Sequence, residues 1–201
     1  YFFLSPGHAR QNRPEEEFDV EWFWYFGIYS FLGFCLEVLF ARATHQSKRD
    51  RKCFFLLPLC PVYGLGALWI LALPAPVLQS NLLLFFGSAL AATGAEYLMS
   101  LFYERLTGVH FWDYRHLPFQ LHGRVCLLFS VFWGMLGVGA VRVLHPLVAQ
   151  FTALIPSFLW PLAACLLLLD GALTLVLLRR THSTDILCWY RRVSRLPLRD
   201  S

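Results

Sequence analysis

Long apolar stretches separated by short polar segments dominate the pattern of this chain. Five stretches of about 17–21 residues are almost free of charged side chains: 23–40, 54–73, 82–102, 125–141 and 158–178. About 20 apolar residues in a helix, at about 1.5 Å rise each, cross a hydrocarbon layer about 30 Å thick. None of the stretches alternates apolar and polar residues as a barrel strand would. The pattern therefore predicts an all-α, polytopic membrane helix bundle with about five transmembrane helices.

The second stretch contains helix-breaking residues in its first half. These are Pro58 and Pro61, and Tyr63-Gly64 follows them directly. Proline removes a helical hydrogen bond and disfavours helix in the residue before it. We expect a helix only from Tyr63 to Leu73, preceded by an extended or re-entrant segment that protein or a water-filled cavity must cover. Such a segment lines a transport site or is simply part of a proline-kinked helix without a site; both interpretations stay open.

Small residues predict where the helices pack closely. Gly27, Ser30 and Gly33 lie three or four residues apart on the first stretch, and Ser130, Gly134 and Gly137 do so on the fourth. Residues at this spacing share one face of a helix, and small side chains there let a second helix approach. The fourth helix is expected to end at His145-Pro146.

Basic residues predict the orientation of the chain. Of 17 lysines and arginines, 14 follow the first, third and fifth stretches. By the positive-inside rule the N-terminus lies outside and the C-terminus in the cytoplasm. We expect an extracytoplasmic tail (1–21), a transmembrane domain (22–179) and a basic cytoplasmic tail (180–201) in the cell inner membrane. Because the chain begins with Tyr1, a truncated N-terminal tail stays an open alternative.

Composition and motifs exclude several classes of function. The chain is 57% hydrophobic and 15% charged, whereas soluble domains carry about 25% charged residues. Its basic residues lack the interleaved aromatic side chains of a nucleic-acid surface, so lipid headgroups are the expected contact. A phosphate-binding loop needs a lysine within a glycine-rich motif, but no glycine lies near Lys48 or Lys52. We therefore expect no enzyme and no cofactor in this chain, and ATP only through a partner subunit.

Polar side chains within or beside the apolar stretches are candidates for a transport path. Acids inside a membrane are costly and usually have a partner, a lumen or a function. We expect one polar cluster in the cytoplasmic half of the bundle, made of Glu37, Thr93, Glu96, Tyr97, Glu104, Arg124 and Asp170. Structural alternatives are a pair between Glu37 and Arg42, a buried hydrogen-bonded Glu96, and a contact between helices at Asp170, which is the favoured interpretation of that residue.

A polar segment between the third and fourth stretches is rich in chemistry-bearing side chains. The residues are His110, Trp112, Asp113, Tyr114, His116 and His122. We expect this segment to act as a gate or coupling loop. Two histidines and an acid suit iron or zinc in kind, but the aromatic rings are typical of an interfacial segment, so no metal site is expected.

Several motifs resemble one known family in the same order along the chain. They are Tyr29-Ser30, Gly33, Glu37, Pro58-Leu-Cys-Pro-Val-Tyr-Gly64, Leu84-Phe-Phe-Gly87, Thr93, Glu96-Tyr97, Glu104, Phe111-Trp-Asp-Tyr114, Pro118-Phe119, Gly123-Arg-Val-Cys-Leu127, Ser130, Trp133-Gly134 and His145-Pro146. The chain resembles the bacterial integral membrane proteins named "putative ABC-transporter type IV" permeases over about residues 22–150.

The resemblance implies a permease subunit without an assigned substrate. Its expected partners are the lipid bilayer, a separate nucleotide-binding ATPase subunit and a second copy in a homodimer. Two alternatives remain open at this point. One is a membrane enzyme acting on a lipid or polyprenyl headgroup, with His110, Asp113 and His116 in acid–base roles. The other is a non-catalytic lipid-binding or assembly protein whose acids are structural.

Overall fold

Four long apolar helices form the frame of the molecule. The computed structural model describes residues 15–45 and 53–188. Four helices within them are each long and apolar enough to cross a membrane: α1 (Glu15–Ala43), α4 (Asn81–Thr107), a continuous run from Leu127 to Ala153, and α7 (Trp160–Thr181). Large apolar side chains on their outward faces are exposed, among them Leu90, Val143 and Leu168. The predicted all-α membrane bundle is therefore confirmed.

The second apolar stretch is broken as predicted, and it contributes a short helix rather than a full-length span. Residues 53–60 are non-helical, and α2 (Pro61–Leu71) is 11 residues long. Its start lies two residues earlier than expected because proline is tolerated at the first helical position, where its missing N–H has no helical partner anyway. A short helix α3 (Ala75–Gln79) then leads into α4. In the described part of the chain the bundle thus has four full-length helices, with the short α2 in place of the second of the five expected helices.

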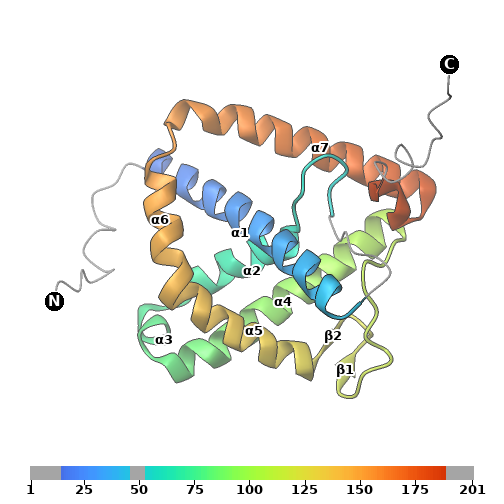
Figure 1. Cartoon of the computed structure of the whole chain (residues 1–201), viewed down its shortest axis with the longest axis horizontal. Helices are drawn as coiled ribbons and strands as arrows, with labels where there is room; N and C mark the ends of the chain where they lie inside the picture. The colour runs from blue at the N-terminus through green and yellow to red at the C-terminus, as the bar shows by residue number, and fades with distance from the viewer. Residues whose placement is uncertain (1–14, 46–52, 189–201) are drawn as a thin grey trace.

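The fourth helix continues through His145-Pro146, so its predicted end there was wrong. Helix α5 (Leu127–Gly139) passes through a π-helical turn (Ala140–Leu144) into α6 (His145–Ala153). Pro146 lies at the start of α6. Proline has no N–H to donate, and the π-helical turn before it changes the spacing of the hydrogen bonds so that the helix continues. Figure 1 shows α6 leading away from α5 toward the start of α7.

Close helix packing occurs at most of the small residues that the sequence indicates. The short α2 lies between α1 and α4, and α4 packs along α5 (Figure 1). A side chain on Gly33 would collide with Tyr63 of α2, and one on Gly137 would collide with Ser88 of α4. Gly27 is different, because no atom lies within 4 Å of the position its side chain would take.

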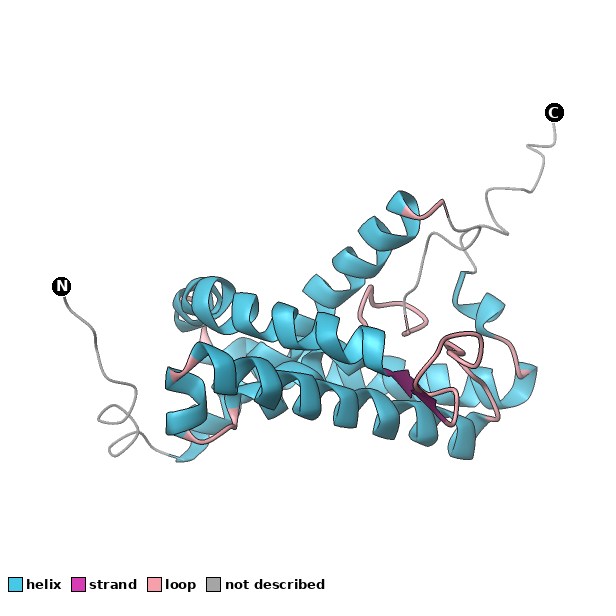
Figure 2. Ribbon diagram, turned by 90° about the horizontal axis from the view of Figure 1, so that it is seen from below, coloured by secondary structure: helices cyan, strands magenta, loops and turns pink. Residues whose placement is uncertain are grey.

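The segment between α4 and α5, which we call the 108–126 loop, folds at one end of the bundle. It contains a two-stranded antiparallel hairpin, β1 (Gln120–Leu121) with β2 (Val125–Cys126). A 3₁₀ helix (Thr184–Cys188) follows α7 and buries Leu187 against Val109 of this loop, while another (Ser157–Leu159) precedes α7 at the far end. Figure 2 shows the hairpin at the end of the helices. Residues 1–14 of the predicted N-terminal tail and 189–201 of the C-terminal tail lie outside the described residues.

Candidate functional site

A buried carboxylate joins three parts of the chain under the 108–126 loop. Glu96 of α4 is only 4% exposed. The Tyr114 hydroxyl of the loop donates to Glu96 Oε1 at 2.8 Å, and the Trp133 indole N–H of α5 donates to Glu96 Oε2 at 3.0 Å. Both carboxylate oxygens are therefore satisfied, as a buried acid requires. The Tyr114 ring also stacks on Phe129, with 4.9 Å between ring centroids, so the loop is held by packing as well.

A second carboxylate lies in the same region and connects α1 to it. The Tyr63 hydroxyl of α2 donates to Glu37 Oε1 at 2.8 Å. The Tyr63 ring in turn contacts the Trp133 ring, with 5.0 Å between centroids. Contacts thus run without interruption from Glu37 through Tyr63 and Trp133 to Glu96. Glu37 faces the bundle, as one of its two interpretations predicted.

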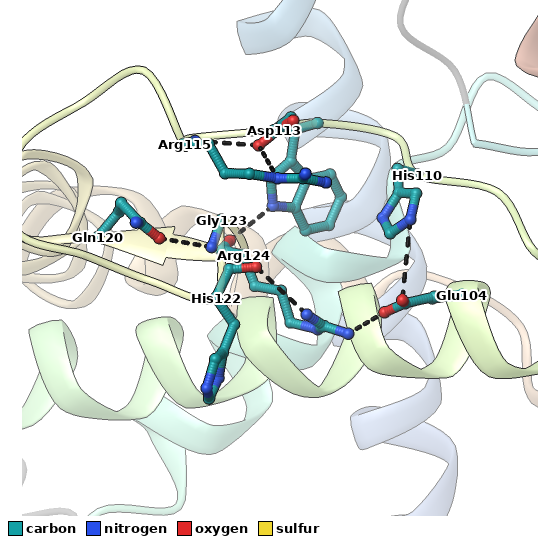
Figure 3. A network of polar contacts seen from close by, with 9 residues as sticks. Glu104, His110, Asp113, Arg115, Gln120, His122, Gly123 and Arg124 are labelled. Carbon is teal, nitrogen blue, oxygen red and sulfur yellow. Dashed lines mark hydrogen bonds and ion pairs between the residues drawn. The ribbon is translucent and has the colours of Figure 1, made fainter.

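An ion pair anchors the far side of the loop to the last turn of α4. The guanidinium of Arg124 bonds Glu104, and His110 Nε2 lies 3.8 Å from Glu104 Oε1 (Figure 3). The Arg124 side chain is only 15% exposed and its Cζ lies 5.7 Å from the centre of the Tyr97 ring. The Trp112 indole donates to the Arg124 carbonyl at 2.7 Å. A largely buried, stacked arginine of this kind is a firmer anchor than an exposed surface pair.

The loop has a defined shape of its own. The Tyr114 N–H donates to the Gly123 carbonyl at 2.8 Å, and the Gly123 N–H donates to Gln120 Oε1 at 2.6 Å. Gly123 has a φ of +70°, a conformation that favours glycine. Asp113 accepts the Arg115 N–H at 2.9 Å, and this bond lowers the pKa of the Asp113 carboxyl. Burial, followed by the neighbouring Glu96, raises the pKa of the Tyr114 hydroxyl.

The structure brings most of the predicted polar residues together. Thr93 donates to Ser130 at 2.8 Å, and Tyr97 shares a 2.9 Å hydrogen bond with His122 Nδ1. We call the assembled set the polar network. Its members are Glu37, Tyr63, Thr93, Glu96, Tyr97, Glu104, Tyr114, His122, Arg124, Ser130 and Trp133. The sequence indicates Ser130 as a packing residue and both Ser130 and Trp133 as parts of motifs, but it does not indicate that either residue joins this network.

Asp170 lies apart from the polar network, contrary to its place in the predicted cluster. Its two oxygens accept hydrogen bonds from the backbone N–H groups of Leu56, at 2.9 and 3.1 Å, and Leu57, at 2.7 Å. Thr174, one turn on, accepts the Phe55 N–H at 2.9 Å. The prolines at 58 and 61 prevent this segment from making helical hydrogen bonds, so α7 provides the acceptors. The contact of Asp170 is thus structural, as its favoured interpretation expects, but it joins α7 to the non-helical 53–60 segment and not to a second helix.

The histidines of the loop do not converge with Asp113 on one point. His110 is directed to Glu104 while Asp113 is directed to Arg115 (Figure 3), and His116 is exposed. Within residues 15–45 and 53–188, no three histidine, cysteine or acidic side chains gather as metal ligands would. The geometry therefore gives no support to a metal centre or an acid–base triad in the described part of the chain.

The fold and the buried polar network define a polytopic α-helical membrane protein. The chain belongs to the family described as "Putative ABC-transporter type IV", which it matches over residues 24–176. The resemblance read from the motifs is thereby confirmed. No characterised protein and no solved structure matches the chain significantly.

Proposed function

We propose that the chain is the membrane-embedded permease subunit of an ABC transporter, with its 108–126 loop as the coupling element. The family relationship supports a transporter-related membrane protein. The placement of basic residues supports an inner-membrane orientation in which the loop and the C-terminus face the cytoplasm. In this proposal a nucleotide-binding subunit supplies ATP hydrolysis, since these 201 residues carry no phosphate-binding loop. A second copy of the chain completes the translocation path.

The observation that carries this proposal is the direct bonding of the loop to a buried acid. A partner that displaces the 108–126 loop pulls on Tyr114, and Tyr114 is bonded to Glu96 between α4 and α5. Trp133 holds the other oxygen of the same carboxylate from α5. The ion pair between Arg124 and Glu104 links the loop to the end of α4 in the same way. Loop movement is thus transmitted to the contact between two long helices, as coupling requires.

Affinity purification in a mild detergent tests the proposal. We expect the full-length chain to recover a polypeptide that carries a phosphate-binding loop, together with ATP hydrolysis. Phe119 and Leu121, at the hairpin, are 82% and 54% exposed and their side chains are outside the polar network. Their joint replacement by alanine should abolish recovery of that subunit. The matched control is Leu154→Ala, because Leu154 is 80% exposed and follows α6 directly. Repeated purification without any ATP-hydrolysing subunit would contradict the proposal.

A further inference from the structure

Two buried thiols meet at the base of the non-helical 53–60 segment. The Cys53 S–H donates to Cys60 Sγ, with 3.6 Å between the sulfur atoms, and the two residues are 6% and 2% exposed. The backbone holds them side by side, because the Cys53 N–H donates to the Leu59 carbonyl at 3.0 Å and the Cys60 N–H donates to the Ser30 carbonyl of α1 at 2.9 Å. Sulfur atoms in a disulfide are about 2.05 Å apart, so small side-chain rotations bring this pair within bonding distance.

An apolar cavity reaches one of the two thiols. Its volume is about 270 Å³, and its walls come from α1, α2, α4, α7 and the start of the 53–60 segment. Cys53 lines it together with Phe26, Phe102 and Leu175, whereas Cys60 is not part of its lining. None of the described residues that line the cavity is charged. The cavity therefore favours the approach of an apolar reagent to Cys53 and disfavours that of a charged one.

We propose that Cys53 and Cys60 are a redox-sensitive pair that a lipid-soluble hydroperoxide converts to a disulfide. Cys53 Sγ attacks the terminal peroxide oxygen, the O–O bond breaks, and the alkoxide leaves as an alcohol with the thiol proton, so that Cys53 becomes a sulfenic acid. Cys60 Sγ then attacks the sulfur of Cys53, the S–S bond forms, and the hydroxyl leaves as water with the Cys60 proton. The hydroperoxide gains the two electrons that the two thiols lose.

This disulfide closes the base of a segment whose other end is held by α7. The N–H groups of Leu56 and Leu57 donate to Asp170, while the two thiols lie where the segment begins and ends. A covalent link at the base restricts the conformations of residues 53–60 even when α7 moves away. In the orientation proposed above the segment lies on the cytoplasmic side, where disulfides are usually transient and redox-sensing. Oxidants dissolved in the bilayer thereby lock the segment between α1 and α7.

The test compares an apolar with a charged oxidant. The full-length chain in nanodiscs of neutral lipid is treated with cumene hydroperoxide, alkylated, digested and analysed by mass spectrometry. We expect the peptide that carries Cys53 and Cys60 to lose two hydrogens, and dithiothreitol to restore them. Glutathione disulfide, which is charged, should produce this disulfide at a rate lower by about tenfold or more. Absence of the disulfide, or an equal rate with both oxidants, would overturn the proposal.

Serine variants test the order of attack. In Cys60→Ser the sulfenic acid at Cys53 has no second thiol to react with, so dimedone should trap it. In Cys53→Ser, dimedone should trap little at Cys60, because Cys60 does not line the cavity. Cys126 is 2% exposed and is also outside the cavity lining, so it is the internal control and should stay unmodified. Equal trapping at Cys53, Cys60 and Cys126 would contradict the role of the cavity. None of these readouts involves an ATPase, so they are independent of the permease assignment.

Discussion

Removal of the Asp170 carboxylate should release the non-helical 53–60 segment from α7. In Asp170→Ala, the backbone N–H groups of Leu56 and Leu57 lose their acceptors. A hydrogen bond to a charged group contributes about 1.5–3 kcal/mol, so the loss of two should lower the free energy of unfolding by about 3–6 kcal/mol. Asp170→Asn keeps one acceptor oxygen and should fall between this variant and the wild type.

Thr174→Val is the matched control, because it removes one neutral hydrogen bond to the same segment and keeps the shape of the side chain. It should cost only about 0.5–1.5 kcal/mol. Unfolding by dodecyl sulfate in mixed micelles, followed by tryptophan fluorescence, measures the difference. Maleimide labelling of Cys53 and Cys60, which are 6% and 2% exposed, should become faster in Asp170→Ala. Equal unfolding of the alanine and valine variants, with both thiols still protected, would show that the Asp170 carboxylate does not hold the 53–60 segment.

Three further predictions concern packing, the ion pair and pH. Gly33→Ala should lower the free energy of unfolding by about 1–3 kcal/mol through overpacking. Gly27→Ala, where the structure leaves space, should be neutral or stabilising by up to about 1 kcal/mol. Equal effects of the two substitutions would contradict the α1–α2 packing. Arg124→Ala should make backbone amides of the 108–126 loop exchange hydrogen markedly faster. Arg115→Ala, which removes a 69% exposed side chain, should not. Similar exchange rates in both variants would count against the Arg124 anchor. Because the pKa of Tyr114 is raised in the folded chain, its contribution is complete below the unfolded tyrosine pKa of about 10 and is lost as pH rises above it. The free energy of unfolding, measured between about pH 9.5 and 11, should therefore fall less steeply with pH in Tyr114→Phe than in the wild type. The same slope in both would count against the buried hydroxyl.

The helices could be predicted from sequence because bilayer thickness sets a length that the apolar stretches match directly. The break before α2 could be predicted for a similar local reason, since Pro58 and Pro61 exclude a regular helix whatever surrounds them. The π turn at Ala140–Leu144 could not, because a proline that would otherwise end the helix is accommodated there by a change in hydrogen bonding over the preceding turn. Local sequence signals are therefore enough to locate most helices. The prediction fails at Pro146, where the preceding turn changes its hydrogen bonding and lets the helix continue.

The hydrogen-bond partners within the polar network depend on which helices pack against each other, and the apolar stretches of the sequence do not specify this. Glu96 was recognisable as a buried acid, but its bond to Trp133 requires knowing that α4 packs along α5. Asp170 had the same residue type and similar apolar surroundings, yet it bonds to backbone more than 110 residues earlier in the chain. Sequence reasoning grouped both acids by depth alone. The structure separates them, because α7 faces the 53–60 segment and α4 faces the 108–126 loop.

Site-specific photocrosslinking from the tip of the 108–126 loop tests whether this loop contacts a nucleotide-binding subunit. A benzophenone side chain replaces Phe119, which is 82% exposed, or Phe158, which is 75% exposed. Phe158 belongs to the Ser157–Leu159 helix between α6 and α7, and Figure 1 shows that junction on the opposite side of the bundle from the hairpin. After irradiation in cells, the products are identified by mass spectrometry. We expect position 119, and not position 158, to crosslink to a polypeptide with a phosphate-binding loop. Crosslinks from position 119 to lipid or to this chain alone would contradict the assignment of the loop as a coupling element.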